Sequence, residues 1–283
     1  MTISGATLVT GVVGEPVRHS LSPLIQNAWI QAAQVDAVYI ALAPVAWTFP
    51  ALLQGLRGGA VHGLNVTLPF KEDALGISDQ ATDRARRAGA ANLLLFEPDG
   101  RIRADNTDGI GLLSAFAEQA PSFDVAARPV VILGAGGAAR GAAAALLDAG
   151  APEVRIVNRT VERANRLARA LGERVTVHEW GGLREAMTTA SAVINATSLG
   201  LAAKEPLAVS FDGLQAGAVV MDMVYRPLRT AFLARAASKG FAVVDGLAML
   251  IGQAAPSFEA FFGRPPPDVD IRRLALTALQ EAS

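Results

Sequence analysis

The stretch VVILGAGGAARGAAAALL, residues 130–147, decides the fold of this chain. It opens with a short continuous apolar run, which is typical of a parallel strand buried on both faces. Gly134, Gly136 and Gly137 follow, and an alanine-rich helix begins directly after them. Glycines permit a tight turn and a close approach of backbone to a pyrophosphate, which the free N–H groups of a helix N-terminus hold. Such a loop can also be no more than a turn, but the strand before it and the helix after it favour a dinucleotide site.

The identity of the dinucleotide depends on the end of the next strand. Ala138 and Ala139 complete the loop, with Ala139 in the third glycine position, where alanine is an accepted variant. Enzymes that use NAD usually carry an acidic residue about 20 positions further on, which binds the ribose 2′-hydroxyl. This chain has Asn158, Arg159 and Thr160 there instead. Arg159 can stack on adenine and pair with a 2′-phosphate, or it can simply cap the next helix. We expect NADP rather than NAD.

Apolar runs and helix signals alternate outward from this stretch. Further strands are expected in the runs 154–159, 175–180, 192–200, 218–225 and 241–246, with helices that end at Asp148 and Leu171 and one that begins at about Pro227. Together with the run 129–137, this order predicts a six-stranded doubly wound sheet of the Rossmann type.

The first hundred residues alternate as well. Strands are expected at 6–14 and 37–43 and in a run that ends at 63–67, helices at 22–34 and 47–57, and a hairpin over 90–106 that turns at Asp99-Gly100. Two more helices are expected at 247–262 and 268–281. We therefore expect an α/β protein of two domains. Residues 1–106, completed by the C-terminal helices at 247–283, form an N-terminal α/β domain, and residues 107–246 form the Rossmann domain.

Composition excludes several functional classes. The 283 residues include no cysteine, which removes disulfides and thiolate chemistry, and the histidines at 19, 62 and 178 lack the spacing of metal ligands. A net charge of −1 gives no electrostatic reason to expect nucleic acid or a membrane surface as partner. No run approaches the roughly 18 apolar residues of a membrane span, and the N-terminus lacks the basic flank of a signal peptide. We expect a soluble cytoplasmic protein that acts on a small molecule.

The stretch GLNVTLPFK, residues 63–71, ends in one of the few lysines of the chain. Lysine occurs only at 71, 204 and 239, so 22 of the 25 basic residues are arginine. Arginine stays charged at any working pH, whereas a lysine can release and take back a proton in suitable surroundings. Lys71 is therefore a candidate for proton transfer.

Several blocks of sequence occur in a fixed order along the chain. They are GEP at 14–16, HSLSP at 19–23, NVTLPFK at 65–71, GAAN at 89–92, DNTDG at 105–109, the loop from Gly134, NRT at 158–160, NATS at 195–198, DMVY at 222–225 and GLAMLIGQA at 246–254. In this order and spacing the chain resembles the shikimate dehydrogenase family over nearly its whole length. The resemblance implies two domains with a cleft between them, a substrate-binding one and an NADP-binding one. It also implies reversible reduction of 3-dehydroshikimate by NADPH in aromatic amino-acid biosynthesis.

The resemblance pairs Lys71 with Asp108 as the catalytic groups, both at the hydroxyl that becomes the carbonyl. Hydride delivery to a ketone leaves negative charge on oxygen, and a positioned proton donor stabilises that change. The alternative is a surface lysine and an aspartate that only caps the helix at 109–119.

The resemblance also assigns binding residues. Ser20 and Ser22 would hold the substrate carboxylate, and Ser22 is expected to be a helix N-cap as well. The ring hydroxyls would be bound by Asn65, Thr67, Asn92 and Gln253, with Tyr225 beside substrate and nicotinamide. The cofactor would contact Gly134, Gly136, Gly137, Ala138, Asn158, Arg159, Thr160, Thr197, Ser198, Met223 and Gly246. No metal is implied.

Two positions depart from the usual family pattern. Gln26 stands where histidine is common, and Leu93 stands where threonine is common. Loss of a hydroxyl at Leu93 leaves open a quinate/shikimate dehydrogenase or a related paralogue with another ring-acid preference. A non-catalytic ligand-binding regulator on the same fold is disfavoured by the presence of Lys71, Asp108 and the complete phosphate loop. The sequence leaves a monomer and a homodimer equally open.

Overall fold

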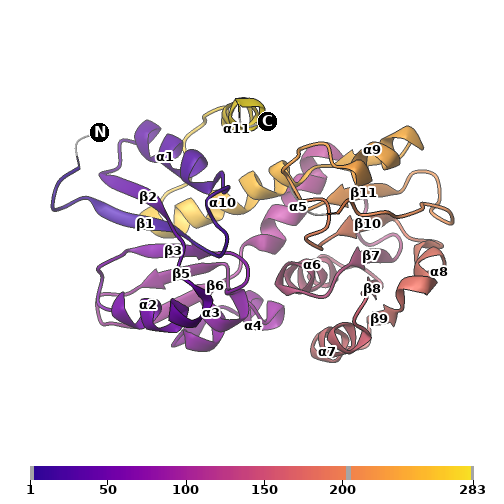
Figure 1. The fold of residues 1–283 in the computed structure, drawn as a ribbon, viewed down its shortest axis with the longest axis horizontal. Coiled ribbons are helices and arrows are strands. Elements are labelled where there is room, and N and C mark those ends of the chain that lie inside the picture. Colours follow the sequence, from indigo (N-terminus) through magenta and orange to yellow (C-terminus); the bar gives the residue numbers. More distant parts are fainter. Residues whose placement is uncertain (1–2, 202–204, 282–283) are drawn as a thin grey trace. The chain divides into compact units, whose positions relative to one another are not determined.

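The computed structural model describes residues 3–201 and 205–281. The chain divides into two compact units (Figure 1). Unit 1 consists of the residues up to Thr107 together with those from Gln253 onward, and unit 2 is Asp108–Gly252. None of the helices in the described part of the chain has the length and hydrophobicity needed to cross a membrane.

Unit 2 is a six-stranded parallel sheet with the order β12-β11-β10-β7-β8-β9. Its strands are β7 (Val130–Leu133), β8 (Val154–Val157), β9 (Val175–His178), β10 (Ala192–Asn195), β11 (Val219–Asp222) and β12 (Ala242–Val244). Its helices are α5 (Asp108–Gln119), α6 (Gly137–Asp148), α7 (Val161–Leu171), α8 (Leu183–Met187), α9 (Ala231–Ser238) and the start of α10 (Gly246–Phe262), with a 3-10 turn η2 (Trp180–Gly182). This is the doubly wound order that the sequence predicts.

Both faces of this sheet are covered by helices, which explains the continuous apolar runs of its strands. Val130 and Ile132 pack into a cluster with buried residues of α5, α6 and α7. Val131 and Leu133 point to the opposite face, into a cluster with α8 and α9. The last of these helices begins at Ala231 rather than at the expected Pro227.

Unit 1 holds a mixed six-stranded sheet with the order β2-β1-β3-β5-β6-β4. Its strands are β1 (Leu8–Val13), β2 (Ala37–Leu42), β3 (Gly63–Val66), β4 (Gln80–Ala81), β5 (Leu93–Phe96) and β6 (Ile102–Asp105). The strand β1 runs parallel to β2 and β3, whereas β5 is antiparallel to both β3 and β6. The β5–β6 pair is the predicted hairpin, and Gly100 takes the positive φ of +86° in its turn.

The helices of unit 1 are α1 (Ser22–Ala32), α2 (Phe49–Gly55), α3 (Lys71–Ile77), α4 (Asp83–Ala88), the end of α10 and α11 (Ile271–Glu281), with a 3-10 turn η1 (Ala46–Thr48). The helix α10 packs closely against β3, because a Cβ on Gly63 would lie 2.5 Å from the ring of Phe261. Further along the same strand, Asn65 lies beside α10 and donates to Ser257 Oγ at 2.8 Å.

Candidate functional site

The loop after β7 is built to leave a helix N-terminus open. Gly134 has φ of +116°, and a Cβ there would lie 3.2 Å from the backbone of Ala196, so glycine is required. Gly136 is the N-cap of α6 and makes no side-chain cap, and a Cβ on it would meet no atom within 4 Å. No side chain therefore caps the first N–H groups of α6, and the space beside Gly136 is open, which fits a pyrophosphate. The chain's own residues thus satisfy the geometry that a dinucleotide cofactor needs.

Cationic and polar side chains follow the neighbouring strand β8. Arg159 is exposed, and its guanidinium makes no hydrogen bond to any described residue. Asn158 Nδ2 donates to Thr160 O at 2.8 Å, and Thr160 is the N-cap of α7 without a side-chain cap bond. The alternative that Arg159 caps this helix finds no support in these contacts. Arg163, four residues after Arg159, lies in the first turn of α7 and is also exposed.

The loops after β10, β11 and β12 meet at the same edge of the sheet, because parallel strands end together there. A Cβ on Gly134 would lie 3.2 Å from Thr197 Cγ2, and Met223 N donates to Asn195 O at 3.0 Å. Gly246 packs so tightly on this edge that its Cβ would lie 2.5 Å from Met223 O. The structure therefore brings together the expected cofactor residues of four strands. Ser198 and Tyr225 belong to the same loops.

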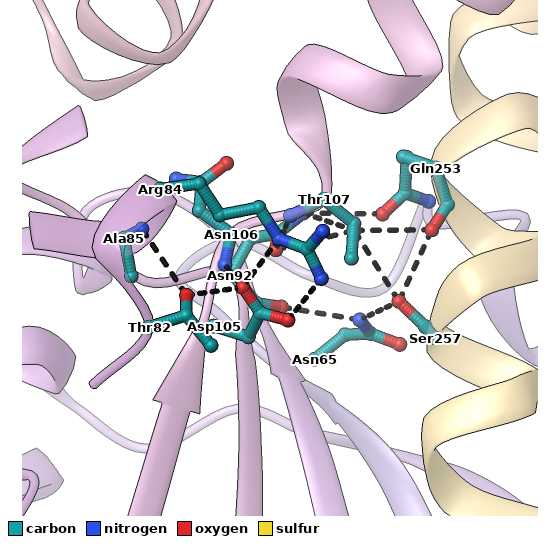
Figure 2. A network of polar contacts seen from close by, with 10 residues as sticks. All are labelled: Asn65, Thr82, Arg84, Ala85, Asn92, Asp105, Asn106, Thr107, Gln253 and Ser257. Atoms are coloured by element: carbon teal, nitrogen blue, oxygen red, sulfur yellow. Dashed lines mark hydrogen bonds and ion pairs between the residues drawn. The ribbon is translucent and has the colours of Figure 1, made fainter. Parts of the chain in front are cut away.

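In unit 1 the amide of Asn65 is held in one orientation (Figure 2). Its Nδ2 donates to Asn92 O at 3.1 Å and to Ser257 Oγ at 2.8 Å, and its Oδ1 accepts from Tyr39 Oη at 2.8 Å. Burial raises the pKa of Tyr39 well above its usual value, so this phenol is a permanent donor. Both N–H groups of Asn65 are already used, which leaves only acceptor capacity on Oδ1 for a ligand.

The amide of Asn92 is fixed in the same network. Its Oδ1 accepts from Thr107 N at 2.7 Å, and its Nδ2 donates to Thr107 Oγ1 at 3.0 Å and to Gln253 Oε1 at 3.3 Å. Ser257, one helical turn after Gln253 on α10, donates to Gln253 O at 3.1 Å. Three of the expected hydroxyl-binding residues, Asn65, Asn92 and Gln253, are therefore linked. Thr107 and Ser257 were missed as members of this network, and the turn-spaced pair on α10 was the only sequence signal for the serine.

A cluster of charged and polar side chains surrounds Asp105 at the end of β6 (Figure 2). Arg84 bonds both carboxylate oxygens of Asp105, with Nε to Oδ1 at 2.7 Å, and Thr82 Oγ1 donates to Oδ1 at 2.5 Å. Asn106 N donates to the same oxygen at 2.7 Å. Burial by itself would raise the pKa of Asp105, but these bonds outweigh it and lower the pKa below its usual value. The cluster fixes the strand end that leads to Thr107.

Each of the two catalytic candidates is the first residue of a helix. Lys71 is the first residue of α3 and half-buried, and its carbonyl accepts from Ala91 N at 2.8 Å, directly beside Asn92. This position is not that of a freely exposed surface lysine. Asp108 is 5% exposed and is the first residue of α5 in unit 2, next in the chain after Thr107.

The serine and threonine candidates lie after β1 and β3. Ser20 Oγ accepts from Ser22 N at 3.2 Å. The expectation that Ser22 caps α1 is wrong, since Ser22 is the first helical residue and the N-cap is Leu21, without a side-chain bond. The hydroxyl of Ser22 makes no hydrogen bond to the described residues and remains available. Thr67 packs against the loop after β1, because a Cβ on Gly14 would lie 2.2 Å from Thr67 Cγ2.

Three family models match the chain. They are the shikimate dehydrogenase substrate binding domain over residues 12–94, the shikimate/quinate 5-dehydrogenase domain over 116–208, and the shikimate 5′-dehydrogenase C-terminal domain over 246–276. The chain is 57% identical to a shikimate dehydrogenase (NADP(+)) of Caulobacter vibrioides over 280 residues, which cover 99% of this chain and 98% of that one.

Solved structures give the same picture. Shikimate 5-dehydrogenase of Thermus thermophilus, in complex with NADP(H) and shikimate, matches with a TM-score of 0.84 and 36% identity, covering 96% of this chain and 99% of that one. Quinate dehydrogenase of Corynebacterium glutamicum, in complex with NAD, matches with a TM-score of 0.86 and 27% identity, covering 97% and 99%.

Proposed function

The chain belongs to the shikimate dehydrogenase family, and from this premise we propose that it catalyses the NADP-dependent interconversion of 3-dehydroshikimate and shikimate. The observation that carries the choice of cofactor is the end of β8, where Arg159 is exposed and unpaired among the described residues and no carboxylate stands in its place. A guanidinium suits the 2′-phosphate that distinguishes NADP from NAD. The open N-terminus of α6 would hold the pyrophosphate, and Thr197, Ser198, Met223 and Gly246 would line the rest of the cofactor site.

NADPH supplies a hydride when it is bound. The chain's task is then to supply a proton at the carbonyl oxygen, where negative charge develops. We assign that task to the Lys71 ammonium, with Asp108 as the second group at the same oxygen. Lys71 suits it because the bond from Ala91 N ties its backbone to the residue beside Asn92.

The buried amide network determines how ring hydroxyls would be recognised. Asn65 has only acceptor capacity left, so a substrate hydroxyl would donate to its Oδ1. The hydroxyls of Ser20 and Ser22 would donate to the substrate carboxylate, as neutral donors suited to an anion. We assign Thr67, Asn92 and Gln253 to the other ring oxygens, and Tyr225 to the position beside the nicotinamide.

The two positions that depart from the family pattern lie in the interior of unit 1. Leu93 is 1% exposed in the core of β5, and Gln26 is fully buried with its Nε2 donating to Ala254 O at 3.0 Å. Quinate remains the second candidate substrate because the quinate dehydrogenase of Corynebacterium glutamicum shares the fold. We propose that unit 1 is the substrate-binding domain and unit 2 the NADP-binding domain of a cytoplasmic enzyme, a monomer or a homodimer.

A steady-state comparison tests this function. Oxidation of shikimate and of quinate is measured with NADP⁺ and with NAD⁺, and the four values of kcat/KM are compared. We expect the highest value for shikimate with NADP⁺. A higher value for quinate would replace the substrate assignment, equal or better use of NAD⁺ would replace the cofactor assignment, and no turnover of either acid would leave a ligand-binding role.

A further inference from the structure

The carboxylate of Asp222, at the end of β11, is fully buried and accepts three hydrogen bonds. Its Oδ1 accepts from Asn195 Nδ2 at 2.8 Å and from Val224 N at 3.0 Å, and its Oδ2 accepts from Thr230 Oγ1 at 2.6 Å. Every one of these donors is neutral. A carboxylate buried among neutral groups costs stability compared with an apolar side chain of similar size, so fold stability alone does not explain it.

Asn195, at the end of the neighbouring strand β10, organises its own loop in a similar way. Its Oδ1 accepts from Thr197 N at 3.0 Å and from Thr197 Oγ1 at 2.7 Å. Thr197 Oγ1 in turn accepts from Leu199 N at 3.1 Å. The hydrogen bond from Asn195 to Asp222 therefore links the loop 196–199 to the loop 223–225.

The position of these two linked loops in the sheet indicates which half of a dinucleotide they would receive. A doubly wound sheet consists of two mononucleotide-binding halves that meet where the strand order reverses, here at the pair of β7 and β10. The glycine loop after β7 and the arginine after β8 serve the adenosine half of the cofactor. The loops after β10 and β11 belong to the other half, which receives the nicotinamide nucleotide.

We propose that Asn195, Asp222 and Thr230 form a buried brace of positioning residues, which holds the loops 196–199 and 223–225 in the conformation that receives the nicotinamide half of NADP. This inference rests on the proposed function of the chain as an NADP-dependent enzyme. None of the three side chains needs to touch the cofactor, because they act through the backbone of the loops that Thr197 and Met223 occupy.

The test compares Thr230→Val with Thr230→Ser. Valine keeps the shape of threonine and removes its hydroxyl, whereas serine keeps the hydroxyl. The same hydroxyl also accepts from Leu233 N at 3.2 Å as the cap of α9, so the midpoint of urea unfolding is measured for each variant. Binding is measured without substrate, for NADPH by fluorescence and for 2′,5′-ADP by calorimetry. The second ligand contains the adenosine half and the 2′-phosphate but lacks the nicotinamide.

We expect Thr230→Val to weaken NADPH binding by roughly tenfold or more, the range for loss of a hydrogen bond to a charged group. Binding of 2′,5′-ADP should remain within about twofold of wild type, and Thr230→Ser should restore NADPH binding. Equal weakening of both ligands, or no weakening of NADPH, would overturn the brace. If the wild type binds neither ligand, the proposed function itself fails, and that outcome is distinct from failure of the brace.

Asp222→Leu gives a second route to the same answer if Thr230→Val does not fold. Leucine has a similar size and offers no acceptor, so the bonds from Asn195, Val224 and Thr230 are all lost. The brace predicts the same selective loss of NADPH binding over 2′,5′-ADP binding. A variant that folds and binds both ligands as the wild type does would contradict it.

Discussion

Buried amides in unit 1 have little freedom to serve a ligand in more than one way. Asn65 spends both N–H groups on Asn92 O and Ser257 Oγ, while Tyr39 occupies one lone pair of its oxygen. A flip of this amide would set its oxygen against Asn92 O and its NH2 group against the hydroxyl of Tyr39, so the observed orientation is favoured. In the proposed contact with a ring hydroxyl, Asn65 is therefore the acceptor.

Replacement of Lys71 tests the proton donor directly. Lys71→Ala is expected to lower kcat for shikimate oxidation by about 10²-fold or more, the range for loss of a general acid–base group, with a modest change in the KM for shikimate. Steady-state kinetics and circular dichroism measure the effect and check the fold. Lys239→Ala is the matched control, because Lys239 is 47% exposed and pairs with the exposed Asp212. Near wild-type turnover in Lys71→Ala would remove this lysine from the chemistry.

The hydrogen bonds of Asp105 predict that the free energy of unfolding depends on pH in the acid range. Although burial opposes it, bonds from Arg84, Thr82 and the backbone of Asn106 lower the pKa of Asp105 below its usual value in the folded state. A lowered pKa stabilises the fold above the unfolded-state pKa, and this contribution is lost as the pH falls through the folded-state pKa. The free energy of unfolding should therefore decrease as the pH drops below about 4.

Asp105→Asn should lower stability at pH 7 by about 1–3 kcal/mol, the range for hydrogen bonds to a charged group, and should flatten the acid slope. Urea unfolding at several pH values from neutral to acidic measures both effects. Asp212→Asn is the control, since Asp212 is 64% exposed and an exposed ion pair contributes little. An unchanged slope in Asp105→Asn would assign the acid sensitivity to other carboxylates.

At the scale of elements, α10 connects most of the polar network of unit 1. Gln253 and Ser257 lie one turn apart on it, and both bond residues from other segments, Asn92 and Asn65 respectively. The expected bounds of this helix, 247–262, agree closely with the observed Gly246–Phe262. Apolar periodicity was enough to find α10, whereas the short α3 and α4 were not foreseen, because each spans only about two turns.

The junction of β8 and α7 carries the prediction for cofactor choice. Arg159→Ala should lower kcat/KM for NADPH by roughly 10–100-fold, as expected for the loss of a charge-assisted contact, and should leave that for NADH little changed. Steady-state reduction of 3-dehydroshikimate with both cofactors measures the difference. Arg166→Ala is the control, because Arg166 is an exposed arginine on α7, the helix that follows Arg159. A wild type whose KM for NADH is equal to or below that for NADPH would contradict the role of Arg159.

For the whole molecule, cofactor binding should appear as added stability. A ligand that binds only the folded state adds about 2.7 kcal/mol to the free energy of unfolding at 100 times its Kd. We expect NADP⁺ at that concentration to raise the midpoint of urea unfolding, and NAD⁺ at the same concentration to raise it less. Equal shifts with the two cofactors would argue against discrimination by the 2′-phosphate.

The doubly wound architecture was predictable because its signals are local. The strand, the glycine loop and the helix of VVILGAGGAARGAAAALL are contiguous, and each further strand of unit 2 is a short apolar run next to its own helix. The fold class and the doubly wound order are therefore confirmed. The positions of Arg159 and of the glycines also follow from strand ends that can be located by counting.

The availability of individual polar atoms was decided only by tertiary structure. Asn65 and Ser257 are 192 positions apart, yet they share a hydrogen bond. Thr230, which lies beyond the end of β11, donates a hydrogen bond to the carboxylate of Asp222 on that strand. The need to satisfy every buried donor and acceptor brings such residues together. Sequence periodicity reports which face of an element is buried, but it carries no record of which distant side chain will supply the partner. For this reason the chain by itself determined its sheets and cofactor loop, and only the folded structure determined which groups remain free to recognise a substrate.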